Sequence, residues 1–255
     1  MMRRIFSVAF LNFKQGVREK IFLGVIFFFI FFLALCLFLG ELSAGESQKV
    51  LRSAGLAGIE LSSVILVIFS LVLSFYKDKE THFMEICLGY YRRTEYLSGK
   101  LIGFLFICLT YLFLCALGYS LLLWLYQAFL WPVLAGVAAL FLKLVIIISL
   151  ALLSCCIFSS SLVALMASLF VYLASERAYM ALQIVALDNK GDISLKLFKL
   201  LYYSLPNMNR LDIKPLVIYG KLPDLNFILS LSLYSLTYAL LLWLIARLIF
   251  LKKEY

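Results

Sequence analysis

The sequence lacks the motifs that carry most catalysis and nucleotide binding. Histidine occurs once, at His82, so the two-histidine HExxH motif is absent, and GxSxG is absent as well. No GxxxxGK[ST] is present, because Gly99-Lys100 is followed by Leu101 and has no glycine five residues earlier. The chain therefore cannot hold ATP in a P-loop. We expect no enzyme activity, no catalytic residue, and no metal or cofactor in this chain.

Charge is also scarce. Charged residues make up 15% of the 255 residues and hydrophobic residues 65%, whereas soluble domains have about 25% charged and roughly 45–50% apolar residues. This composition indicates an integral membrane protein without a separate soluble domain. The net charge of +9 does not predict nucleic-acid binding, because the basic residues cluster at the ends of apolar runs, where anionic lipid attracts them.

The six cysteines form no metal-binding or disulfide pattern. Five of them lie in apolar runs, only Cys87 lies in a charged segment, and no CxxC occurs. We therefore interpret them as small, polarizable packing residues.

Six apolar runs have the length of membrane-crossing helices, about 20 residues each. The bilayer core offers the backbone no hydrogen bonds, so these runs must be helical, and they lack the period-two alternation of barrel strands. The first run is also too long for a signal peptide and is expected to stay uncleaved. We predict an all-α, polytopic membrane protein that forms one transmembrane domain over residues 1–255. The predicted spans are residues 21–40, 53–76, 101–131, 132–153, 157–180 and 225–250.

The distribution of Lys and Arg predicts that both termini are cytosolic, in a multi-pass protein of the plasma (cytoplasmic or inner) membrane. Residues 1–20 are expected to form an amphipathic elbow helix on the inner leaflet, and a disordered basic leader is the alternative. Residues 188–224 are predicted to form a structured outer loop. Within it, residues 194–206 are expected to dip into the membrane interface before Pro206.

A charged island, residues 77–100, separates the second and third spans. Lipid cannot host so many charges, so the island must lie in water, and its basic residues favour the cytosol. A helix of roughly residues 83–91 would present an apolar centre within a charged rim, as docking surfaces do. The alternative is a solvated turn whose apolar face rests on lipid headgroups. The centre would contain Phe83, Met84, Ile86, Cys87 and Tyr90, and the rim Glu80, Glu85, Arg92 and Arg93.

Lys143 is the one charged residue between Pro132 and Ser175, near the middle of the fourth span. Such a charge usually faces a bundle interior or water, so we expect Lys143 to line a translocation path or a subunit interface and to pair with an anionic group. Snorkelling or a shifted span register is the alternative. No pair of carboxylates is expected inside the spans, because Glu60 is placed in the outer part of the second span and Glu176 in a polar extension of the fifth.

The island and the six spans together resemble the permeases of type-2 ABC exporters. In that family the island has an acidic start, then Thr, Glu and leucines, a turn, and finally Arg, Glu-Tyr and a Gly-Lys that opens the third span. The proline that usually precedes the arginine is missing, and Gly89-Tyr90-Tyr91 stands there instead. The most specific stretch is RRTEYLSGKLIG. The family order is filled by Glu80, Thr81, Glu85, Arg93, Glu95, Tyr96, Gly99 and Lys100.

This resemblance implies a cytosolic coupling helix in the island and short re-entrant helices before the last span. It also implies two partner ATPase subunits, which bind ATP and Mg, and a second permease copy or paralogue beside this chain in the membrane. The function implied is that of the permease subunit of an ABC transporter, in efflux. An ATP-independent carrier or channel, expected to show intramembrane acids, and a membrane assembly factor are the alternatives. The implied ATPase-coupling residues are Glu80, Phe83, Met84, Glu85, Arg92, Arg93, Glu95, Gly99 and Lys100.

Overall fold

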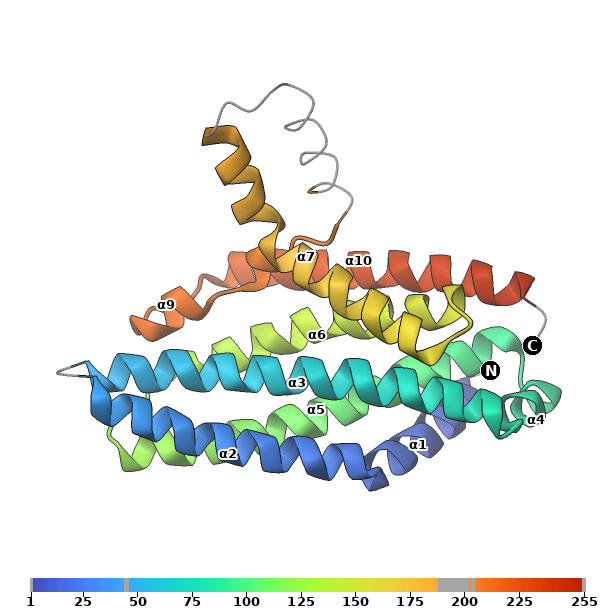
Figure 1. Ribbon diagram of the computed structural model, residues 1–255, viewed down its shortest axis with the longest axis horizontal. Coiled ribbons are helices and arrows are strands. Elements are labelled where there is room, and N and C mark those ends of the chain that lie inside the picture. The colour runs from blue at the N-terminus through green and yellow to red at the C-terminus, as the bar shows by residue number, and fades with distance from the viewer. Residues whose placement is uncertain (1, 44–45, 188–201, 203–204, 254–255) are drawn as a thin grey trace.

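A computed structural model describes residues 2–43, 46–187, 202 and 205–253. In this part of the chain all regular structure is helical, and six helices are long and apolar enough to cross a membrane (Figure 1). These six are α2, α3, α5, α6, α7 as far as Met180, and α10. The elements in chain order are α1 (Met2–Arg18), α2 (Lys20–Leu42), α3 (Ser47–Glu80), α4 (Phe83–Tyr90), α5 (Arg93–Leu125), α6 (Pro132–Ile157), α7 (Ser161–Leu187), η1 (Met208–Leu211), α9 (Lys214–Ile218) and α10 (Leu225–Lys252).

The helices α3 and α6 form the core of the bundle. In their most apolar stretches 72% and 78% of the residues are buried, against 22% in α2 and 17% in α10. The peripheral helices instead turn large apolar side chains outward, for example Phe27 and Phe113. Water would penalise such continuous apolar faces, whereas lipid solvates them, so the fold is that of a multi-pass helical membrane protein.

Both chain termini and the short helix α4 lie at the same end of the bundle (Figure 1). The end of α2, the start of α3 and α9 lie at the opposite end. An even number of crossing helices requires this arrangement of the termini. We call the first end the α4 end and the second the α9 end.

Several helix bounds differ from the predicted spans, because the helices continue beyond the apolar runs into polar residues at the bundle ends. At the α9 end, α3 begins at Ser47, where buried Arg52 donates to the carbonyls of Ala128 (2.8 Å) and Ile218 (3.2 Å). At the α4 end, α3 continues to Glu80 and α5 begins at Arg93. The connection between these two helices is therefore residues 81–92, shorter than the charged island of residues 77–100.

The third and fourth spans also differ in length from the prediction. The predicted run of residues 101–131 ends as a helix at Leu125 and turns at Gln127, whose φ is 51°. The fourth span continues to Ile157, and α7 begins at Ser161. Of the predicted outer loop, Tyr202 and residues 205–224 are described, and they include η1 and α9. Most of the predicted interfacial stretch 194–206 lies outside the described residues.

Helix α1 packs along the first half of α5 through two glycines. A Cβ on Gly99 would lie 2.6 Å from the Cβ of Val8, and a Cβ on Gly103 would lie 2.8 Å from the carbonyl oxygen of Ala9. Only glycine therefore allows α1 to approach α5 this closely. The residues that α1 buries, among them Val8, Ala9 and Asn12, face the protein.

Candidate functional site

A cluster of four charged side chains lies inside the bundle, in the part of the molecule formed by α3, α6, α7 and α9. We call it the mid-bundle charge cluster, and it consists of Glu60, Lys143, Glu176 and Lys214. Lys143 is in the middle of α6, and its side chain is 2% exposed. Its Nζ donates to Oε1 of Glu60 on α3 and to Oε1 of Glu176 on α7, the latter at 3.1 Å.

The second carboxylate oxygen of Glu60 accepts from Lys214, which lies on α9 in the outer loop. Glu60 thus connects a core helix to a short helix that is 154 positions later in the chain. Tyr172 of α7 completes the cluster. Its hydroxyl lies 3.5 Å from Glu60 Oε1, and its ring centre lies 5.5 Å from Lys143 Nζ.

The cluster contains two acids and two bases, so its formal charge is zero. A single charge near the bilayer centre costs about 2.5–3.5 kcal/mol on insertion scales. Pairing offsets part of that cost, although a buried pair is seldom a net gain over apolar packing. Four such residues in one place are therefore better explained by a function than by stability.

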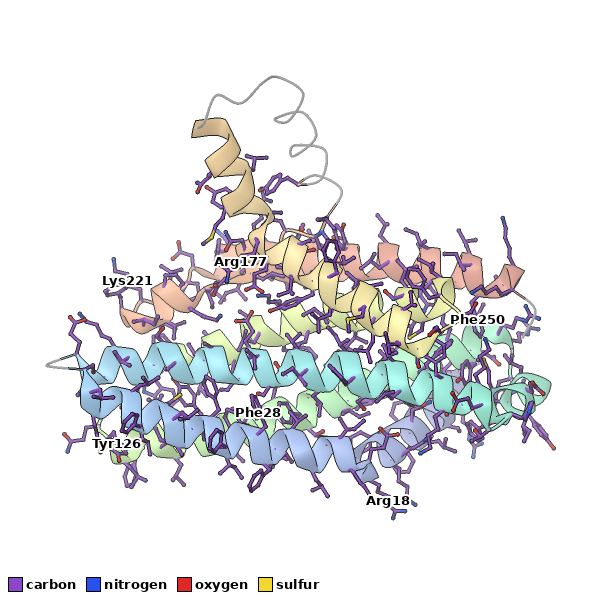
Figure 2. The ribbon with its side chains drawn as sticks, viewed as in Figure 1. Arg18, Phe28, Tyr126, Arg177, Lys221 and Phe250 are labelled. Atoms are coloured by element: carbon purple, nitrogen blue, oxygen red, sulfur yellow. The ribbon has the colours of Figure 1, made fainter. Side chains whose placement is uncertain are left out.

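A cavity of about 450 Å³ lies beside the cluster, between α3 and α7. Glu60, Tyr172 and Glu176 contribute to its wall together with apolar side chains. Arg177 also lines it, on the part of α7 labelled in Figure 2. A mostly apolar cavity with a few converging polar groups is the usual form of a ligand or transport site.

The expectation that no carboxylate pair lies inside the spans is wrong. Glu60 and Glu176 both belong to membrane-length helices and both bond Lys143. The prediction failed because it treated each run by itself and placed Glu176 in a polar extension. Glu60 and Lys143 are single charges in otherwise apolar runs, and this is a signal that could have found the cluster, since each needs a partner at its own depth.

The second candidate region is the connection between α3 and α5 at the α4 end. The chain reverses at His82, which has a left-handed φ of 53°, and its Nδ1 lies 2.9 Å from Glu85 Oε1. Helix α4 follows and divides the predicted apolar centre in two. Met84 and Cys87 are buried against the bundle, whereas Ile86 and Tyr90 are 60% and 80% exposed. Burial raises the pKa of the Cys87 thiol, as expected of a packing residue.

The nine predicted coupling residues differ in exposure, so they cannot all contact a partner directly. Burial of Glu95 is explained by its contact with the helix start, since its carboxylate accepts from the backbone N–H of Arg92 at 3.1 Å. Gly99 is buried because α1 covers it. The exposed residues are Glu80, Glu85 and Arg92, the partly buried ones Phe83 and Arg93, and the buried ones Met84, Glu95, Gly99 and Lys100.

Lys100 belongs to a buried polar group that joins both ends of the connection. Its Nζ lies 2.5 Å from Oδ2 of Asp78 on α3, and the Tyr96 hydroxyl donates to the same oxygen at 2.8 Å. Phe250 of α10 stacks on the Tyr96 ring, with 6.2 Å between ring centres, at the position labelled in Figure 2. Asp78 was not singled out from the sequence, although it lies in the charged island.

Arg93 and Lys253 tie the same end of the bundle to the last helix. The Arg93 guanidinium donates to the carbonyls of Leu251 (3.0 Å) and Lys253 (2.7 Å), which end α10. The Lys253 ammonium donates to the carbonyl of Ile157 at the end of α6 (2.8 Å). These contacts satisfy carbonyls that a helix end leaves without partners, and they link α5, α6 and α10.

No protein-family model matches this chain, and a search of curated proteins gives no match either. The class that fold and composition define is a multi-pass helical membrane protein with six candidate membrane spans.

Proposed function

We propose that this chain is the membrane-spanning permease subunit of an ATP-binding-cassette exporter, moved by a separate ATPase. The observation that carries the proposal is α4. This eight-residue helix joins two membrane-length helices, is anchored by Met84 and Cys87, and presents Glu85, Ile86 and Tyr90 outward. An apolar and charged surface on a short, anchored helix suits a docking contact with a soluble subunit.

In this proposal, contacts between the residues around α4 transmit its motion to the membrane-length helices. A push on α4 reaches α3 and α5 through the Asp78–Lys100 pair, and it reaches α10 through Arg93. Helix α3 extends from Asp78 to Glu60 without a break. A tilt of α3 would therefore move Glu60 against Lys143 and Lys214, which opens or closes the cavity between α3 and α7. In this proposal the ATPase binds ATP and Mg, a second permease copy or paralogue completes the path, and both termini face the cytosol.

Copurification from the native membrane tests the proposal. The tagged chain should bring down a P-loop ATPase, and the substitutions Ile86→Asp and Tyr90→Asp together should abolish that association. Leu222→Asp is the matched control, because Leu222 is 66% exposed and lies in the outer loop near α9. A detergent-stable, stoichiometric complex of the chain without any such ATPase would refute the proposal.

The mid-bundle charge cluster favours a second candidate, an ATP-independent ion-coupled carrier. Intramembrane acids that bond a lysine and a tyrosine are common in proton and ion pathways, and Glu60 and Glu176 fit that description. Liposomes that contain only this chain separate the two candidates. Flux driven by an ion gradient without ATP would favour the carrier, and dependence on the ATPase would favour the permease. A membrane assembly factor needs no cavity inside its bundle, so the cavity beside Lys143 argues against that alternative.

A further inference from the structure

A second cavity, of about 900 Å³, lies at the α4 end where α1, the start of α2 and the end of α3 meet. We call it the elbow groove. One of its walls is a single face of α1, on which Leu11, Lys14 and Arg18 follow at helical spacing, and Lys77 of α3 contributes to the lining. Arg18, labelled in Figure 2, marks its corner beside the start of α2.

The groove is rich in positive charge. Lys14, Arg18, Lys20 and Lys77 line it, and all four are exposed. No ion pair of the described residues engages any of these four cations, in contrast to Lys100, Lys143 and Lys214 deeper in the fold. Glu19 is the one acid in the lining. The groove therefore has a formal charge of +3.

Apolar side chains also line the groove. Phe10 and Leu11 line it and are 61% and 46% exposed. The position also corresponds to the membrane boundary, because α2 starts at Lys20 and continues as an almost uncharged helix. Cations beside exposed apolar surface at that level match a molecule with a phosphate and an acyl chain.

We infer that the elbow groove is a binding site for one anionic phospholipid, with the phosphate on Lys14, Arg18 and Lys77 and the upper acyl chain along Phe10 and Leu11. The volume is within the range of small-molecule sites, roughly 300–1,000 Å³. The net positive charge selects an anionic headgroup over a zwitterionic one. Because α1 packs on α5 and Lys77 belongs to α3, the lipid would connect the elbow helix to the island that carries α4.

Native mass spectrometry of the full-length chain in neutral detergent tests this site. The probes are phosphatidylglycerol and phosphatidylcholine with the same acyl chains, and inorganic phosphate as competitor. We expect the first phosphatidylglycerol to bind at least tenfold more tightly than phosphatidylcholine, since each basic residue of the groove favours an anionic headgroup. Inorganic phosphate should not displace it.

Two double variants distinguish lipid binding in the groove from a general attraction between basic residues and anionic lipid. The substitutions Lys14→Gln and Lys77→Gln together should weaken phosphatidylglycerol binding roughly thirtyfold. Arg4→Gln with Lys252→Gln removes the same charge from exposed positions outside the groove and should change binding less than about twofold. Glu19→Gln should strengthen binding severalfold because it removes the one acid of the groove lining, and misfolding cannot mimic a gain.

Three results would overturn the inference. The first is an equal loss of binding in both double variants, which would indicate a general attraction between basic residues and anionic lipid. The second is equal binding of phosphatidylcholine and phosphatidylglycerol. The third is displacement of the lipid by inorganic phosphate at equal concentration, which would indicate a site for a free phosphorylated compound.

Discussion

Lys100 on α5 and Asp78 on α3 form a buried ion pair of 2.5 Å across the ends of the connection that carries α4. Both side chains are almost completely buried, at 0% and 3% exposure. The pair links the two helices directly. The two ends of the connection that carries α4 are therefore joined to each other. A displacement of α4 must therefore move α3 and α5 together.

Lys100→Met should destabilise the protein by about 3–5 kcal/mol, because it leaves Asp78 as an uncompensated buried charge. Asp78→Leu together with Lys100→Met should lose much less, since no unpaired charge remains. Thermal unfolding in detergent measures both. A double variant as unstable as Lys100→Met alone would show that the uncompensated charge of Asp78 is not the cause of the loss.

In the mid-bundle charge cluster, Lys143→Met should lower stability by a few kcal/mol, because Glu60 and Glu176 lose a shared cation. Adding Glu60→Gln removes one charge of the opposite sign and should restore part of the stability. Under the proposed permease function, transport and ATP hydrolysis by the complex should stay low in the double variant, because the polar groups at the cavity are changed. Ser149→Ala is the control on the same helix, since its hydroxyl bonds only within α6. If Lys143→Met is expressed normally and its transport is unchanged, Lys143 does not contribute to the translocation path.

Gly103→Val should separate α1 from α5, because a Cβ there would lie 2.8 Å from the carbonyl oxygen of Ala9 and from the Cβ of Asn12. Overpacking of this kind typically costs about 1–3 kcal/mol. Gly118→Val on the same helix is the matched control, since a Cβ at Gly118 meets nothing within 4 Å. Thermal unfolding of the two variants measures the difference, and equal losses would mean that the valine in the helix, rather than the contact with α1, sets the cost.

Glu19 should make stability depend on pH. Burial raises the pKa of its carboxyl above the ordinary 4.5, and Asp78 adds to this effect, whereas Lys77 and Lys100 oppose it. The folded state therefore holds the proton more tightly than the unfolded state, and stability falls as pH rises from 4.5 through the folded pKa.

The thermal midpoint of the native chain should accordingly drop more than that of Glu19→Gln as the pH rises above 4.5. The comparison of the two proteins isolates Glu19 from every other titrating group. Parallel curves for the two proteins would contradict the prediction.

The sequence predicted the membrane class and the number of candidate spans because hydrophobicity over about 20 residues is a local property. Helix ends were less predictable. Helix α3 starts at Ser47, six residues before the predicted span, in a polar stretch where Arg52 contacts residues 76 and 166 positions away, and no local pattern contains these contacts. In α4 the apolar pattern correctly indicated a helix of about the right length, but not that Met84 turns inward while Ile86 and Tyr90 turn outward.

What the amino-acid sequence determined by itself is that this chain has helices suited to cross lipid and that charged residues 77–100 separate two of its apolar runs. Only the tertiary structure decided which charges meet. Glu60, Lys143, Glu176 and Lys214 lie far apart along the chain, and the packing of α3, α6, α7 and α9 places them in one cluster. The physical reason is that an unpaired charge in lipid is costly. The position of such a charge in the sequence therefore indicates that it needs a partner. Which residue becomes the partner depends on how the helices pack.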